Sequence, residues 1–242
     1  LLPTNRSVQA LNEAFVRRAE GGLLLPRLVA IGDDALDERI GAALDSDVDE
    51  PVPPAVDPLL RRMILARRIA DRRRAAGEPI DGGEAFRLAG DLGRTLDQLL
   101  VEEVAPARLA GIVGEDLSEH WASTLDLLRI VLDGWPAELA RLGRIDLAER
   151  RRLLLDRAAR HWRDTPPAGF VIAAGISTAA PAVARLLRTI SRRDDGMVVL
   201  PALDLDMPEA EWTALGPGDP DPVTGAHGKA EETHPQFQLK RL

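Results

Sequence analysis

The sequence contains no cysteine and no tyrosine, and aromatic residues make up only 3% of its 242 residues. Without cysteine, these residues cannot supply disulfides, iron–sulfur ligands, thiolate–metal sites or a cysteine nucleophile. No apolar run approaches the roughly 20 residues of a membrane-spanning helix, so we expect no membrane contact and a cytoplasmic protein. Lysine occurs only at positions 229 and 240, and arginine therefore carries nearly all of the positive charge.

The apolar content of 45% is ample for a hydrophobic core, in one large or two small domains. The net charge of −8 argues against wholesale electrostatic coating of nucleic acid. A local basic face remains compatible with this charge.

The first segment, residues 1–33, has an α/β pattern. Thr4 is placed to cap a helix whose apolar residues recur at three- and four-residue spacing, namely Val8, Leu11 and Phe15. The apolar run 23–31 predicts a strand buried on both faces, as in a parallel sheet. Pro26 within this run favours an edge position.

The second segment, residues 34–165, has the periodicity of a helical bundle. Asp57-Pro58 predicts a helix start, because aspartate caps the helix and proline suits its first position. The pattern predicts that this helix buries Leu60, Met63, Ile64 and Ile69. We expect further amphipathic helices around Phe86–Leu100, along the apolar seam from Trp121 to Trp135, and from Asp146 onward.

The third segment, residues 166–242, returns to an α/β pattern. Short apolar strands are predicted at Phe170–Ala174 and Met197–Leu200, with a helix from Pro181 between them. A long loop is predicted near 216–235, where glycine, proline and acidic residues are frequent. Strand–helix–strand units at both ends predict an α/β fold, in which a large all-helical insertion interrupts one parallel sheet.

Both termini are expected to lie within structured segments, since residues 1–3 resemble the end of a strand and residues 238–242 the start of a helix. This pattern favours an internal piece of a larger protein. No phosphate-binding G-x-x-x-x-G-K-[ST] motif is present, and the histidines lack the spacing of a zinc site. We therefore expect no catalytic residue, no metal ligand and no cofactor in these residues.

Two polar turns each follow a predicted strand and precede a helix: Thr4-Asn5-Arg6, and the turn that contains Gly175, Ser177 and Thr178. In open parallel sheets, ligands bind outside the carboxyl ends of the strands, where helix N-termini attract anions. Simple helix capping by threonine and serine is the alternative explanation. The arginine-rich helix at 58–76 is open to two interpretations as well, a solvated face or a nucleic-acid contact.

Several stretches resemble the AddB family, the second subunit of bacterial AddAB helicase–nucleases in its alphaproteobacterial form. They are residues 1–7, Leu24-Leu25-Pro26-Arg27, Glu119-His120-Trp121, Val171–Gly175, Val199–Asp204 and His234–Phe237. The resemblance covers nearly the whole chain, although none of these stretches is a diagnostic catalytic motif.

The resemblance implies a partial RecA-like sheet with a helical insertion, as in a degenerate superfamily 1 helicase. It also implies an AddA-type helicase–nuclease partner, and sequence-independent contact of single-stranded DNA with Thr4, Asn5, Arg6, Gly175, Ser177 and Thr178. The expected function is non-catalytic guidance of DNA in recombinational double-strand break repair. One alternative is a helical scaffold that binds a protein partner without touching DNA, and another is a small α/β enzyme.

Overall fold

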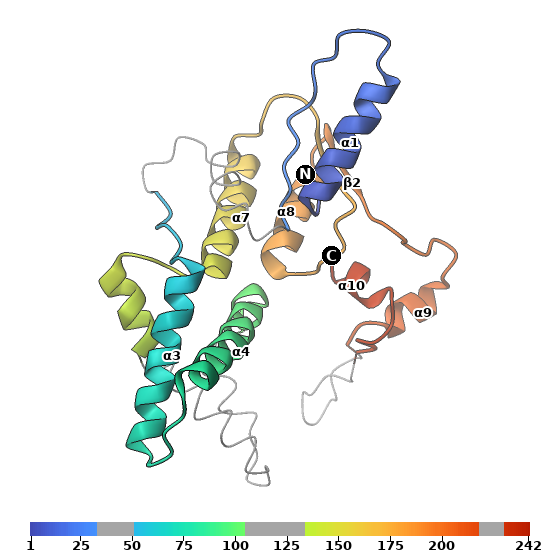
Figure 1. The fold of residues 1–242 in the computed structure, drawn as a ribbon. Coiled ribbons are helices and arrows are strands. Elements are labelled where there is room, and N and C mark those ends of the chain that lie inside the picture. Colours follow the sequence, from blue (N-terminus) through green and yellow to red (C-terminus); the bar gives the residue numbers. More distant parts are fainter. Residues whose placement is uncertain (33–50, 105–133, 218–229) are drawn as a thin grey trace. The chain divides into compact units, whose positions relative to one another are not determined.

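The computed structural model describes residues 1–32, 51–104, 134–217 and 230–242 (Figure 1). The fold is mixed α/β, mostly helical, with a small two-stranded parallel sheet. The chain forms two compact units: a sheet unit, made of Leu1–Asp47 and Leu155–Leu242, and a helical unit, Val48–Leu154. The helical unit thus separates two parts of the sheet unit in the sequence.

The sheet consists of β1 (Val171–Ala174) and β2 (Gly196–Val199), which run parallel with Val171 opposite Gly196. The helix between them, α8 (Pro181–Ser191), buries most of its apolar side chains, including Leu186 and Ile190. The sequence predicted both strands and this helix to within two residues, because a strongly amphipathic helix between two short apolar runs is the pattern of a βαβ unit.

Backbone hydrogen bonds extend this parallel pairing to two short segments near the N-terminus. The Ala174 amide donates to the Leu1 carbonyl at 3.0 Å, the Leu2 amide to Val29 at 2.8 Å, and the Ile31 amide to Leu2 at 2.8 Å. Leu2 and Ala30 form a parallel bridge. The segments therefore lie side by side in the order 29–31, 1–3, β1, β2.

The predicted strand at 23–31 is wrong over most of its length. Only Ala30 forms a bridge, and the side chains of Leu23, Leu24 and Leu25 are exposed. Pro26 lacks the amide that a ladder needs, and the run has no second neighbour to bury it. The helix predicted before it is confirmed as α1 (Asn5–Arg18), in which the Ser7 amide donates to the Thr4 hydroxyl at 3.2 Å.

One face of the sheet is open, and its apolar side chains are exposed. Ile172 and Met197 are register partners on this face, with 46% and 55% of their surfaces exposed. On the opposite face, where α8 packs, Ala173 is buried. Parallel sheets normally have both faces covered, so this small sheet is only half enclosed by the described residues.

The C-terminal residues of the sheet unit form two short helices, α9 (Glu209–Ala214) and α10 (Phe237–Arg241). Gln236 connects α10 to the chain that leaves β2: its side-chain amide donates to the Ala202 carbonyl at 2.8 Å, and its oxygen accepts from the Asp204 amide at 3.1 Å. The predicted loop near 216–235 lies mostly outside the described residues.

In the helical unit, α3 (Pro58–Ala75) packs against α4 (Gly82–Val101). Asp57 and Asp81 cap the two helices, each accepting a backbone N–H at 2.8 Å. The core includes Leu65, Ile69, Ala89 and Leu96, together with Trp135 from the helical residues 134–142. Most of the predicted seam from Trp121 lies outside the described residues.

The predicted buried face of α3 is only partly correct. Ile69 is buried as expected, but Leu60 and Met63 are exposed, and Leu65 and Ala66 are buried in their place. The helix carries apolar residues on two adjacent sides, and contact with α4 selects the side that contains Leu65. The sequence alone does not specify that contact.

The helical unit contains a buried polar network around Asp146, which directly precedes α7 (Leu147–Asp164). The Asp146 carboxylate accepts a hydrogen bond from Trp135 Nε1 at 2.9 Å and lies 2.8 Å from Arg61 Nε. Arg61 also donates to Asp97 at 2.9 Å. Burial raises the pKa of the Asp146 carboxyl, and the neighbouring Arg61 and Trp135 oppose this rise only in part.

Candidate nucleic-acid interface

The two polar turns singled out in the sequence lie next to each other in the sheet unit. Residues 1–3 and β1 are hydrogen-bonded neighbours, and they run in the same direction. Their carboxyl ends therefore meet at one edge of the sheet, where the Thr4 and Gly175 turns begin. A Cβ atom placed on Gly175 would lie 3.7 Å from Cδ of Pro3, so the two turns lie close to each other.

In the first turn, Thr4 and Arg6 are exposed. The Thr4 hydroxyl accepts the Ser7 amide at 3.2 Å and lies 3.0 Å from the Ser7 hydroxyl, so Thr4 caps α1. Asn5 is the first residue of the helix and is half-buried. Capping and ligand contact are compatible here, because the hydroxyl and the guanidinium of this turn remain accessible to solvent.

In the second turn, Gly175 has a φ of +75°, in the left-handed region that favours glycine. Its amide donates to the Val199 carbonyl at 2.9 Å, so this bond fixes the end of β1 against β2. Ile176 is buried and holds the turn to the core, whereas Ser177 and Thr178 are exposed. The Thr178 hydroxyl accepts the Ala180 amide at 3.5 Å.

The order of the segments sends the chain away from these two turns in opposite directions along the sheet. From residues 1–3 the chain passes through α1 to 29–31 on one side, whereas from β1 it passes through α8 to β2 on the other. Right-handed crossovers would direct α1 and α8 toward opposite faces of the sheet, but only α8 makes extensive contacts with β1 and β2 among the described residues. In open α/β sheets, ligands bind at the carboxyl edge where the chain leaves adjacent strands in opposite directions.

The side chains at this edge of the sheet are polar. It offers hydroxyls from Thr4, Ser177 and Thr178 and one cation, Arg6. Within the described ranges, no group of three or more histidine, aspartate or glutamate side chains is arranged to hold a metal ion. These groups suit an oxyanion that is held by hydrogen bonds and one charge.

The arginine-rich helix predicted at 58–76 is largely occupied by contacts within its own unit. Arg68 pairs with Glu138 at 3.2 Å and Arg73 with Glu78 at 2.6 Å. Arg62 stacks on the Phe86 ring at 4.0 Å from its centroid and donates to the Phe86 carbonyl at 2.9 Å. These contacts favour a structural role for the helix over a nucleic-acid contact.

The sequence reasoning missed a cluster of arginines at the end of α7 and along α8. Three of them, Arg185, Arg188 and Arg192, have i, i+3, i+7 spacing, which places them on one side of α8 and its final turn. This spacing is visible in the sequence and could have indicated a basic side of the helix. The contribution of α7 to the cluster becomes visible only in the folded chain.

None of the helices in the described ranges combines the length and apolar character that a bilayer crossing requires. Models of protein families, curated proteins and solved structures were all compared with this chain, and none of them matches it.

Proposed function

We propose that this chain is a non-catalytic, helicase-like part of an AddB-type subunit, which guides single-stranded DNA in a cytoplasmic helicase–exonuclease complex during recombinational double-strand break repair. In this proposal the sheet unit is a partial, degenerate superfamily 1 helicase domain with a RecA-like sheet. The partner is an AddA-type subunit that supplies ATP hydrolysis.

The observation that carries the proposal is the adjacency of the two polar turns at the carboxyl edge of the sheet. The hydrogen bonds of Leu1 with Ala174 and Ile172 bring them together, although they are more than 170 positions apart in the sequence. Parallel-sheet proteins bind ligands at this position. Hydroxyls, backbone amides and one arginine bind phosphate without reading bases, so the contact is sequence-independent.

A double substitution, Arg6→Ala with Thr178→Ala, tests this site in the full chain. We expect weaker binding of a fluorescently labelled oligothymidylate, measured by anisotropy at low salt. For single strands, loss of one phosphate contact lowers the slope of log affinity against log salt concentration (the salt slope) by about 0.7 in magnitude. Arg18→Ala is the matched control, since it removes an exposed arginine from the other end of α1. Affinity equal to that of the control variant would remove the site assignment.

One observation favours the alternative of a protein-binding scaffold. Leu59, Leu60 and Met63 form an exposed apolar patch at the start of α3. Trp135 is enclosed in the core, so this residue does not belong to a docking surface. If the scaffold alternative holds, Met63→Glu disrupts binding of the AddA-type partner, while oligothymidylate binding by the chain is absent in every variant.

A further inference from the structure

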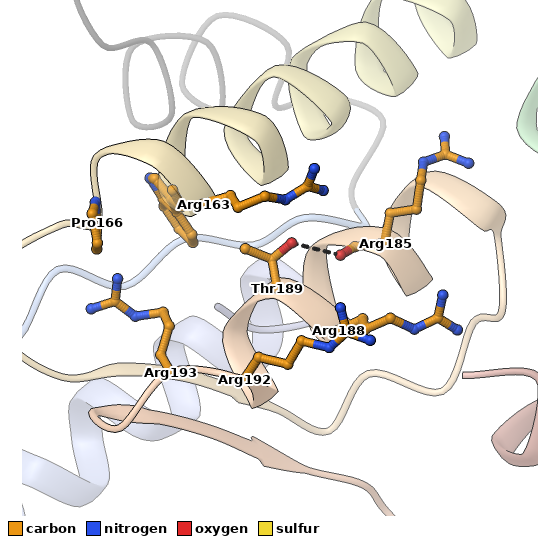
Figure 2. Close-up of a pocket in the computed structure, with 8 residues that line it drawn as sticks. Arg163, Pro166, Arg185, Arg188, Thr189, Arg192 and Arg193 are labelled. Carbon is orange, nitrogen blue, oxygen red and sulfur yellow. Dashed lines mark hydrogen bonds between the residues drawn. The ribbon is translucent and has the colours of Figure 1, made fainter.

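The arginine cluster of the sheet unit surrounds an open pocket of about 460 Å³ (Figure 2). It lies between the end of α7 and the second half of α8, on the helix-covered side of the sheet. The pocket is lined by Arg163, Arg185, Arg188, Arg192 and Arg193, with Trp162 beside them. No carboxylate lines it, so a chain with a net charge of −8 concentrates five guanidinium groups at one place.

Two of these arginines are held by ion pairs. Arg185 contacts the Asp156 carboxylate at 2.7 Å, which connects α8 to α7, and Arg193 contacts Asp195. Arg163, Arg188 and Arg192 are exposed, and no carboxylate in the described part of the chain pairs with them. The pocket therefore keeps about three uncompensated positive charges. These three guanidinium groups are accessible to an anion that enters the pocket.

Arg193 supplies a second observation that points to a ligand. Only 10% of its side chain is exposed. Nη2 donates to the Pro167 carbonyl at 3.0 Å, but Nε and Nη1 are buried and have no hydrogen-bond partner among the described residues. Figure 2 shows this side chain extending toward Pro166 at the rim of the pocket. Unsatisfied charged donors are costly when buried, and a bound oxyanion would satisfy them.

The dimensions of the cluster favour a chain of phosphates over a single one. From Arg185 to Arg192 the helix and its final turn rise about 10 Å, at 1.5 Å per residue. Successive phosphates of a stacked strand are about 3.4 Å apart along the axis, so the row spans several of them. Trp162 adds a half-buried aromatic surface at the same pocket. Proteins that bind single strands combine a basic groove with aromatic stacking of this kind.

We propose that this pocket binds the phosphate backbone of single-stranded nucleic acid, with Trp162 stacking on a base. The site differs from the strand-end turns, because the arginines extend along α8 away from its start near Thr178. It does not depend on those turns, and the Arg6→Ala/Thr178→Ala variant leaves all five arginines intact. Either site can therefore fail without the other.

The test uses the full chain with Arg163, Arg188 and Arg192 all replaced by glutamine. These side chains are exposed, so the fold is retained, which far-UV circular dichroism checks. We expect the affinity for oligothymidylate to fall at least about tenfold, and the salt slope to fall by about 2 for three lost contacts. The matched control replaces Arg17, Arg18 and Arg160, three exposed arginines of the same unit outside the pocket, and keeps full affinity.

Trp162→Phe separates a nucleic-acid site from a general anion site. A smaller ring stacks less well, so we expect several-fold weaker oligothymidylate binding and unchanged competition by inorganic tripolyphosphate. The proposal is overturned if the triple glutamine variant binds like its control. The assignment to single-stranded nucleic acid is overturned if Trp162→Phe leaves the affinity for oligothymidylate unchanged, or if the pocket binds tripolyphosphate but not oligothymidylate.

Discussion

Replacement of Asp146 tests the physical account of the buried network in the helical unit. The Asp146 side chain is 7% exposed and contacts Arg61, which is 12% exposed. It also accepts the Nε1–H of Trp135, which is 2% exposed. Asparagine keeps an acceptor for Trp135 and removes only the charge, whereas alanine removes both. The two variants therefore separate the hydrogen bond from the ion pair.

Asp146→Ala leaves the indole donor buried without a partner, which costs about 1–3 kcal/mol. It also leaves Arg61 with Asp97 as its remaining carboxylate, at 2.9 Å. Breaking a buried pair costs about 3–5 kcal/mol when no partner remains, and Asp97 reduces this cost. We expect a loss of about 3 kcal/mol in the free energy of unfolding for Asp146→Ala, and about 1 kcal/mol for Asp146→Asn.

The assay is urea unfolding of the full chain, followed by circular dichroism and tryptophan fluorescence, at several pH values between neutral and about 4. Burial raises the pKa of Asp146, so the folded state binds a proton at a higher pH than the unfolded state. The stability contribution of this group therefore falls as pH rises through the interval from the unfolded pKa, about 3.9, to the raised folded pKa. Asparagine does not titrate.

The stability advantage of the wild type over Asp146→Asn should consequently widen as the pH is lowered through that interval. A gap that narrows on acidification would mean that Arg61 and Trp135 outweigh burial, and it would refute the reasoning. If the alanine and asparagine variants lose the same free energy of unfolding, the hydrogen bond from Trp135 to Asp146 does not contribute to stability.

The remaining predictions concern backbone geometry in the sheet unit. Gly196→Ala should destabilise the chain by about 2 kcal/mol or more, because the added Cβ would lie 1.9 Å from the Ile190 carbonyl oxygen. Gly21→Ala is the control, because its added Cβ would have no atom within 4 Å. Equal free energies of unfolding in urea for the two variants would contradict the prediction. Thr4→Ala should cost about 1 kcal/mol of local stability in α1 through loss of the cap, while Thr4→Ser retains it. Hydrogen exchange of the first α1 amides measures this effect, and protection equal to wild type in the alanine variant would contradict it.

Sequence patterns predicted the helices where one side of the helix was unambiguous. The apolar residues of α4 repeat on a single side, and Ala89, Leu92 and Leu96 are buried as the periodicity indicates. In α3, apolar residues occupy two adjacent sides, so the contact with α4 determines which of them are buried. Arg61 shows the consequence: it belongs to the arginine-rich helix for which the sequence indicated a solvated face or a nucleic-acid contact, but only 12% of its side chain is exposed and it pairs with Asp97 and Asp146.

The candidate site was predictable in part. A parallel sheet brings the carboxyl ends of its strands to one edge, so the location of the Thr4 and Gly175 turns at the same edge followed once the strands were assigned. The order of the segments did not follow, because nothing in residues 1–3 specifies which strand pairs with them. The arginine pocket needed both α7 and α8, whose contact through Asp156 and Arg185 is a tertiary feature.

The hydrogen bond between Ala174 and Leu1 has a consequence for synthesis of the chain. During synthesis, residues 1–3 leave the ribosome long before β1 does, so they can pair early with residues 29–31 but not with β1. Meanwhile α3 and α4, which are close in sequence, can pair early. Until β1 is made, one edge of residues 1–3 stays unpaired, and chaperone binding or aggregation at that edge is expected when translation stops before β1.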